Sequence, residues 1–304
     1  MNPGTALVTG GAGFVGTALC GLLAEHGWEL RNPSLRLMAE PAKWRDAMRS
    51  THCVVHLAAR VHHMREDADA ETSYDRINID GSRFVAEQAA SAGVRRMIFL
   101  SSIKVNGEGG MRTYRATDAP DPRDPYARSK LAAELAIREV CENSGMEWVI
   151  VRPPLVYGPG AKANFRRLLR LVDIGIPLPF GSIQNRRSLV GLSNLVHFIE
   201  TCMIHPRAAR QIWLIADDEC VSTAELLRRL SRHMNRRMRL FPFSPRWLRR
   251  FSVLLRAQAE IDKLSGTLEL DASPAREQLG WLQASSLDEE LSRTVAAYQA
   301  EKNR

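Results

Sequence analysis

A glycine-rich turn between an apolar run and an amphipathic segment is the feature that most limits how this chain can fold. Residues 6–9 predict a short buried strand, and Gly10, Gly13 and Gly16 follow it at intervals of three. Gly10 permits a tight turn, Gly13 lets the backbone approach a pyrophosphate, and Gly16 lets a helix pack closely on the strand. The free N–H groups at the start of that helix can bind an anion. The unit predicts a dinucleotide-binding fold.

Apolar runs and helical patterns alternate along the first half of the chain. The expected strands cover 53–58, 96–101 and 147–152, and the expected helices cover 74–92 and 126–143. This alternation predicts an α/β protein with a Rossmann-like, doubly wound parallel sheet and helices on both faces. The stretch between Gly27 and Cys53 is short for a strand, a helix and another strand, so we expect one crossover to be missing or trimmed.

The pattern loosens after Arg152. A helix within 163–172 is followed by strand patterns at Leu189-Val190 and 211–215, which we expect to return to the sheet. Further helices are expected after Ser222 and Ser286, each with a capping box, and at Ser273-Pro274. We therefore expect a dinucleotide-binding domain over 1–152 with returning segments at about 187–216. A smaller, mainly helical substrate lobe is expected from 153–186 and 217–304.

The composition is that of a globular protein, with 45% hydrophobic and 25% charged residues in 304. The five cysteines are scattered without a C-x-x-C pair, as is typical of reduced thiols, so we expect a cytoplasmic protein. We expect neither a signal peptide nor a membrane span, since no apolar run approaches roughly 20 residues. The eight histidines are spread out, and no metal site is predicted.

The net charge of +8 is concentrated late in the chain, where ten arginines lie between 228 and 256. We interpret this charge mainly as a solvated face with some contacts to an anionic substrate. Loose association with an anionic membrane surface is the alternative. The amphipathic stretch 246–256 is more typical of core packing than of a membrane anchor. Nucleic-acid binding is not predicted, because no recognised module accompanies the charge.

Tyr126 and Lys130 lie four residues apart at the start of an expected helix, so their side chains share one face. A free phenol has a pKa near 10, and a neighbouring ammonium favours the phenolate. The phenolate can take the proton of a sugar hydroxyl while hydride leaves for a nicotinamide. Ser101-Ser102 ends the preceding strand at the edge where such folds bind ligands, and a hydroxyl there can hydrogen-bond the reacting oxygen.

The choice between the two nicotinamide cofactors depends on the end of the second strand. An acidic residue there binds the adenosine ribose of NAD. This stretch contains Arg31 and Arg36 and has no Asp after an apolar run. Because basic residues suit the 2′-phosphate of NADP, we expect NAD or NADP, with a slight preference for NADP.

In order along the chain, these motifs resemble those of the extended short-chain dehydrogenase/reductase family, in its nucleotide-sugar epimerase/dehydratase branch. The resemblance runs from Thr5 to about Trp281 and rests on Thr9 to Gly16, His56 to Ala59, Asn78 with Gly81, Ser101-Ser102, Tyr126 with Lys130, Arg152-Pro153, Tyr157 to Gly160 and Leu279 to Trp281. It implies the catalytic residues Ser102, Tyr126 and Lys130. It implies cofactor contacts by Gly10, Gly13, Phe14, Val15, Gly16, Arg36, Leu57, Ala58, Ala59, Asn78, Ser101, Tyr126, Lys130 and Pro153.

The resemblance implies only some of the family's substrate contacts, because one substrate-binding segment is absent from this chain. Asn164-Phe165 matches a pair that meets the diphosphate and base, and Arg187 matches an arginine that clamps the diphosphate. Ser102 and Lys104 are expected at the sugar. A later R-P-G-D segment of the family is absent, and Ser265-Gly266-Thr267 stands nearby instead.

Departures from the family pattern reduce the number of reactions that we expect this chain to catalyse. The 4,6-dehydratases carry Asp-Glu directly after the catalytic hydroxyl, whereas this chain has Ile103-Lys104. A dehydratase is therefore not expected. Asn106 replaces the tyrosine of a V-Y-G segment, so we expect the wall of the sugar pocket to differ, and Leu155 replaces a polar Asn.

The resemblance leaves two reactions open. The first is 4-epimerisation of a UDP-(N-acetyl)hexose, in which hydride returns to the other face of a keto sugar. The second is NADPH-dependent reduction of a UDP-4-keto-6-deoxy-hexosamine, in which hydride is given once. Both are typical of surface-polysaccharide biosynthesis. A non-catalytic dinucleotide sensor is disfavoured by the intact catalytic residues. The expected partner is a nucleotide-sugar, and analogy with the family implies a homodimer.

Overall fold

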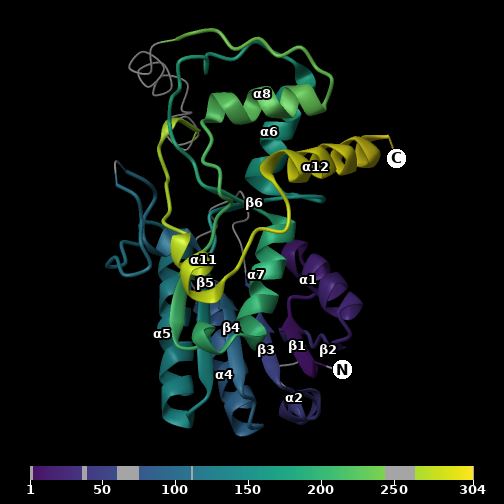
Figure 1. Ribbon diagram of the computed structural model, residues 1–304. Coiled ribbons are helices and arrows are strands. Elements are labelled where there is room, and N and C mark those ends of the chain that lie inside the picture. The colour runs from purple at the N-terminus through teal and green to yellow at the C-terminus, as the bar shows by residue number, and fades with distance from the viewer. Residues whose placement is uncertain (1–2, 36–39, 60–74, 111, 244–263, 304) are drawn as a thin grey trace.

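The main sheet has six parallel strands. The computed structural model describes residues 3–35, 40–59, 75–110, 112–243 and 264–303. The strands lie in the order β2 (Glu29–Arg31), β1 (Thr5–Thr9), β3 (Cys53–His56), β4 (Arg96–Leu100), β5 (Glu147–Arg152) and β8 (Gln211–Leu214), as Figure 1 shows. The direction of winding reverses at β1, so the glycine turn lies at the topological switch point. The predicted Rossmann-like sheet is confirmed.

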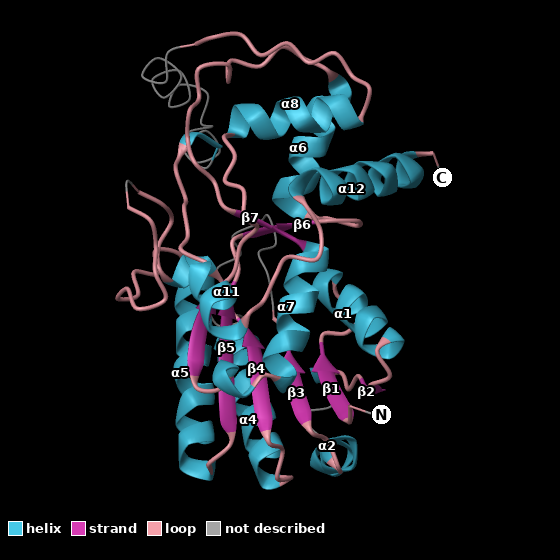
Figure 2. Cartoon of the chain, viewed as in Figure 1, coloured by secondary structure: helices cyan, strands magenta, loops and turns pink. Residues whose placement is uncertain are grey.

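Helices cover both faces of this sheet (Figure 2). One face carries α1 (Phe14–Glu25) and α7 (Leu192–Ile204), and the other carries α2 (Pro41–Met48), α4 (Gly81–Ser91) and α5 (Pro125–Ser144). Successive strand residues point to opposite faces, so Val54 and Met97 pack with the second group while Val55 and Ile98 pack with the first. The middle residues of β1, β3, β4 and β5 are therefore apolar on both faces, as a covered parallel sheet requires, and polar residues stand at the strand ends.

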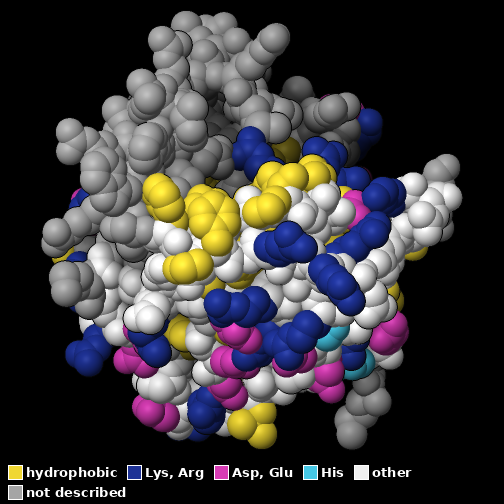
Figure 3. Space-filling model, turned by 90° about the horizontal axis from the view of Figure 1, so that it is seen from above, with side chains coloured by type: hydrophobic (Ala, Val, Ile, Leu, Met, Phe, Trp, Pro, Cys, Tyr) yellow, Lys and Arg dark blue, Asp and Glu magenta, His cyan; other side chains and the backbone are white. Residues whose placement is uncertain are grey.

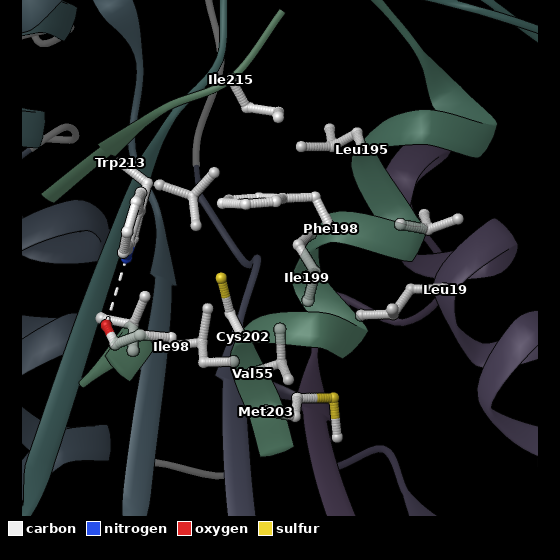
Figure 4. Packing of buried hydrophobic residues seen from close by; sticks show 14 of the residues in the cluster. Leu19, Val55, Ile98, Leu195, Phe198, Ile199, Cys202, Met203, Trp213 and Ile215 are labelled. Carbon is white, nitrogen blue, oxygen red and sulfur yellow. Dashed lines mark hydrogen bonds between the residues drawn. The ribbon is translucent and has the colours of Figure 1, made fainter. Parts of the chain in front are cut away.

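Aromatic rings organise the core between the sheet and α7 (Figure 4). Phe198 meets Trp213 and Trp281 edge-on, with ring centres 6.1 and 5.5 Å away. The Trp213 indole donates to the Ala208 carbonyl at 3.2 Å, which satisfies its buried N–H. Trp281 follows α11 (Ser273–Leu279), so part of the stretch 217–304 completes the core of the dinucleotide-binding domain rather than the lobe.

The segment around Leu189-Val190 does not return to the main sheet. As β7 (Leu189–Gly191) it pairs in parallel with β6 (Leu155–Tyr157), and the two form a separate two-stranded sheet. Our expectation for this segment was wrong because the edge of β5 is already paired with β8. β8 itself joins the main sheet as predicted.

The described residues of the smaller lobe, beyond the carboxyl ends of the strands, form the helices α6 (Ala163–Ile174), α8 (Thr223–His233) and α12 (Leu287–Lys302), visible in Figure 1. The capping box at α12 is complete. At α8 it is half formed, because the Glu225 carboxylate binds Arg229 Nε at 2.9 Å. Within the described ranges, no helix has both the length and the apolar character needed to cross a membrane.

Candidate functional site

The glycine turn follows β1, and its three glycines meet different requirements. Gly10 has a φ of +74°, and a Cβ there would lie 2.8 Å from the Ala58 nitrogen. Gly13 is the exposed N-cap of α1, so the first N–H groups of the helix can face an anion. At Gly16 a Cβ would lie 2.1 Å from the Gly10 carbonyl oxygen. The turn thus combines tight packing at two glycines with an open backbone at the third.

Gly16→Ala should weaken dinucleotide binding by roughly 100-fold, because the methyl group forces the turn out of place. Gly21→Ala is a matched control on the same helix, since nothing lies within 4 Å of its added Cβ. At an exposed helix position alanine is more favourable than glycine by about 1 kcal/mol, so this control should be at least as stable as the parent. Calorimetric titration measures both affinities, and equal values would contradict the predicted phosphate cradle.

Ser102 and Tyr126 are placed at the carboxyl end of β4 by two capped turns. Ser102 starts a 3₁₀ turn, and its Oγ accepts the Lys104 N–H at 3.3 Å. Asp124 caps α5 by accepting a first-turn N–H at 2.6 Å, which fixes the turn that carries Tyr126. The Lys104 ammonium also binds the Asp124 carboxylate. This ion pair holds the turn after Ser102 against the turn that carries Tyr126.

Lys130 lies one turn after Tyr126 and is almost fully buried. Its ammonium donates to the Leu100 carbonyl at 2.8 Å and lies 4.5 Å from the centre of the Phe99 ring. Burial lowers the pKa of Lys130 to about 7, and the charge of Glu134 opposes part of this shift. Lys130 therefore titrates near neutral pH at the end of β4, which suits a residue that takes part in proton transfer.

His56, at the end of β3, ties the glycine turn to α4. Its Nδ1 lies 2.6 Å from Thr9 Oγ1 and its Nε2 lies 2.9 Å from Ser82 Oγ. The imidazole stacks on Phe99 with the ring centres 5.6 Å apart. Burial, assisted by the charge of Lys130, lowers the pKa of His56 to about 3. His56 is thus a neutral structural link rather than a proton donor at neutral pH.

This link predicts a loss of stability in mild acid. Below a pH of about 6.5 the unfolded chain protonates His56, while the folded protein stays neutral there until its pKa of about 3. The free energy of unfolding therefore falls as pH decreases through this window, by about 2 kcal/mol from His56 at pH 5. His56→Gln keeps polar groups for both hydroxyls and should show a flatter profile from pH 8 to 5 in urea unfolding. Parallel profiles would rule out a neutral buried imidazole.

Asn78 supports the backbone that carries Tyr126. It lies in a π-helical turn, Asp75–Asp80, that leads into α4. Its amide donates to Ser129 Oγ at 3.0 Å, and Ser129 Oγ donates to the Tyr126 carbonyl at 2.9 Å. Ser82 Oγ in turn donates to the Asn78 carbonyl at 2.5 Å. Through His56 and Ser82, the polar chain therefore extends from the glycine turn to the first turn of α5.

A buried ion pair that the sequence did not predict lies behind the end of β4. Arg152 donates to the Glu134 carboxylate at 2.9 and 2.5 Å, and both side chains are only 2% exposed. Ser101 Oγ binds the same carboxylate. Arg152 also donates to Asn106 Oδ1 at 2.9 Å. Asn106 is completely buried and acts here as an acceptor for Arg152, where the family pattern has a tyrosine.

The other predicted cofactor contacts lie after β3, at the start of α1 and at the end of β5. Leu57, Ala58 and Ala59 are half-buried after β3, and the Ala58 N–H donates to Thr9 Oγ1 at 3.3 Å. Phe14 and Val15 open α1 and pack partly on the core. Pro153 is buried at the end of β5, where its carbonyl accepts the Ile103 N–H at 3.0 Å.

The structure gives little support to the expectation that basic residues after β2 bind the 2′-phosphate of NADP. The Arg31 guanidinium donates to the carbonyls of Ala47 at 3.1 Å and of Arg49, near the end of α2. It therefore stabilises that helix end and is not directed only at a ligand. Arg36 lies outside the described residues.

The residues predicted to contact the substrate differ in how exposed their side chains are. Asn164 is exposed in the first turn of α6, whereas Phe165 is fully buried and stacks on Tyr157 with centres 5.4 Å apart. The side chain of Phe165 is thus a core group, and only its backbone is available for the contact we expected. Arg187 is half-buried, desolvation lowers its pKa, and its guanidinium donates to the Gly266 carbonyl at 3.0 Å.

Comparisons with known proteins agree with this geometry. Residues 6–216 match the model of the NAD dependent epimerase/dehydratase family. The UDP-glucose 4-epimerase of Vibrio cholerae is 41% identical over 322 residues, covering 99% of this chain and 98% of the relative. The N-acetyl-α-D-glucosaminyl-diphospho-ditrans,octacis-undecaprenol 4-epimerase of Escherichia coli O157:H7 is 26% identical over 255 residues, covering 78% and 74% respectively.

The solved structure of the UDP-glucose 4-epimerase of Thermotoga maritima with UDP-glucose has a TM-score of 0.75 at 20% identity. The alignment covers 98% of this chain and 99% of that one, which shows a common fold over the whole length. The resemblance inferred from the motifs is confirmed: the chain is an enzyme of the NAD-dependent epimerase/dehydratase family of extended short-chain dehydrogenases/reductases.

Proposed function

We propose that the enzyme interconverts the two C4 epimers of a UDP-linked hexose or N-acetylhexosamine. The observation that carries this proposal is the placement of Ser102, Tyr126 and Lys130 at the carboxyl end of β4, on the same sheet edge as the glycine turn. The Vibrio cholerae relative, a UDP-glucose 4-epimerase matched over nearly its whole length, supports this reaction. The Escherichia coli relative, which acts on an N-acetylglucosaminyl diphosphate, supports the N-acetylated sugar as an alternative.

The chain's own residues handle the proton of the reaction. A bound nicotinamide would accept the hydride from C4 and return it to the other face. Tyr126, as the phenolate, takes the C4 hydroxyl proton and gives it back after the sugar has turned over. Ser102 Oγ hydrogen-bonds the same oxygen. Lys130, with a pKa of about 7, stabilises the phenolate while it is protonated. One proton and one hydride leave and return, so no net reductant is consumed.

The residues after Ser102 favour epimerisation over removal of water. Ile103 is buried, and Lys104 is paired with Asp124. Neither position offers the acid and base that a 4,6-dehydratase uses. A 4-keto-sugar reductase would need the same three catalytic residues, so cofactor consumption has to separate it from the epimerase.

The test is incubation of the purified protein with UDP-glucose or UDP-N-acetylglucosamine and a trace of NAD or NADP. We expect each sugar to equilibrate with its 4-epimer while the amount of reduced cofactor stays constant. A second arm supplies UDP-4-keto-6-deoxy-hexosamine with NADPH. Stoichiometric NADPH consumption there, without epimerisation in the first arm, would replace the epimerase by the reductase. Affinities measured for both dinucleotides decide the cofactor.

Arg187→Ala should raise KM for the UDP-sugar by about 10- to 100-fold while kcat changes little, because a charged hydrogen bond to phosphate is worth about 1.5–3 kcal/mol. The neighbouring Arg186→Ala is the control, since its exposed guanidinium pairs with Glu269 at 2.7 Å. Initial rates over a range of substrate concentrations separate KM from kcat. An unchanged KM in Arg187→Ala would show that the diphosphate lies elsewhere.

A further inference from the structure

Two loops run side by side over the end of the lobe farthest from the main sheet (Figure 1). One follows α6 and the other follows α8. The Leu178 N–H donates to the Arg239 carbonyl at 2.9 Å, and the Phe241 N–H donates to the Leu178 carbonyl at 3.1 Å. Near the start of the second loop, Arg236 reaches the Asp173 carboxylate of α6 at 3.4 Å. The two loops and the last turn of α6 therefore form one continuous surface.

The side chains of the second loop alternate between the core and solvent. Met238 and Leu240 pack against the core of the lobe. Arg237, Arg239 and Phe241 are exposed. This period of two is that of an extended strand with one face covered. It directs two guanidinium groups and one aromatic ring outward from the same loop.

Exposed apolar side chains gather on this surface. Of the six large hydrophobic residues exposed in the described part of the chain, three lie here: Ile174 at 68%, Ile176 at 44% and Phe241 at 42%. Arg170, also exposed, lies four residues before Ile174 and hence on the same face of α6. Figure 3 shows hydrophobic side chains beside a concentration of Lys and Arg in this view of the lobe. We call Arg170, Ile174, Ile176, Arg237, Arg239 and Phe241 the distal face.

The charge of the surrounding segments is mainly positive, although Arg228, Arg229 and Arg232 of α8 pair with Glu219, Glu225 or Asp288. Residues 163–182 contain three arginines and 226–243 contain six, against a single acidic residue, Asp173. Asp173 is itself held by Arg236 and Lys302. The distal face thus combines positive charge with protruding apolar groups.

We propose that the distal face docks on a membrane surface rich in anionic lipid. The guanidinium groups bind lipid phosphates, which attract basic groups close to the surface. Ile174, Ile176 and Phe241 enter the boundary between head groups and acyl chains, as on other interfacial surfaces. Binding to a soluble polyanion alone would leave these apolar groups in water. A membrane surface, in contrast, can interact with both the positive charge and the apolar side chains of the face. The inference does not depend on the reaction that the enzyme catalyses.

The test is co-sedimentation of the purified full-length protein with vesicles of phosphatidylglycerol and phosphatidylcholine, compared with phosphatidylcholine alone. We expect binding to the anionic vesicles, weaker binding as salt is raised, and little binding to the neutral vesicles. Arg237→Glu/Arg239→Glu should reduce the partition coefficient at least about tenfold. Ile176→Ser/Phe241→Ser should also reduce it, and the remaining binding should be more sensitive to salt.

The matched control is Arg49→Glu/Arg207→Glu, which changes the net charge equally at two exposed positions near the amino ends of β3 and β8. It should keep at least half of the parent's binding, and circular dichroism checks that all variants are folded. Equal losses in the two charge variants would reduce the effect to net charge and overturn the proposal. A lack of vesicle binding would also overturn the proposal. In that case the face could instead bind duplex DNA, or it could form a dimer, which light scattering would show to dissociate in the distal-face variants.

Discussion

Tyr126→Phe should lower kcat for epimerisation by about 10²- to 10⁴-fold, because in the proposed mechanism the phenolic oxygen takes and returns the substrate proton. Phenylalanine keeps the ring but has no titratable atom. The Asp124 cap and the bond from Ser129 Oγ to the backbone carbonyl of residue 126 do not involve the phenol, so the first turn of α5 should stay in place. The glycine turn is untouched, and dinucleotide affinity should stay within about twofold of the parent value.

The measurement pairs the rate of UDP-sugar epimerisation with the Kd of the dinucleotide. Tyr298→Phe is the matched control: it removes a phenol on α12 that donates to Asp173 at 3.3 Å, in the smaller lobe. This control should keep its turnover. Near-normal turnover in Tyr126→Phe would remove the proposed mechanism. Loss of dinucleotide binding together with activity would instead indicate that the variant disturbs the site as a whole.

Much of the fold could be predicted because the signals are local. The strand at 147–152 and the helix at 126–143 have apolar periods and end signals within their own sequence, and both were found within about one residue of the expected bounds. The short stretch before Cys53 also predicted a trimmed crossover, and its described residues include the three residues of β2 and the two-turn α2. The partner of β7 could not be predicted, because strand pairing depends on which sheet edge is free in three dimensions.

The residues of the candidate site also fall into those that local sequence predicts and those that only the fold brings together. Ser102, Tyr126 and Lys130 stand in motifs whose spacing can be read directly. Glu134 lies four residues after Lys130 on the same helical face, and this period is the one signal that could have pointed to it. Its partner Arg152 lies on the strand β5, so the periodicity of the helix does not reveal the pair. Buried charges that compensate each other look like surface residues until the fold brings them together.

Glu134→Ala should have the largest effect on stability, lowering the free energy of unfolding by about 3–5 kcal/mol. The substitution leaves the Arg152 guanidinium buried with Asn106 Oδ1 as its remaining described side-chain acceptor, at 2.9 Å. It also removes the acceptor of the Ser101 hydroxyl. An uncompensated buried charge costs more than the lost bonds alone, because the group cannot regain its hydration. Urea unfolding followed by circular dichroism measures the change.

Glu139→Ala separates burial from charge, because Glu139 lies on the same helix and also pairs with an arginine. Its bond to Arg83 is 2.7 Å long, but these side chains are 59% and 42% exposed, so removing it should change the unfolding midpoint little. Replacing both members of the buried pair, with Glu134→Met and Arg152→Met, should cost less than the sum of the single substitutions, since neither charge is then left unpaired. Strict additivity, or equal losses at Glu134 and Glu139, would show that the pair behind β4 is no stronger than a surface contact.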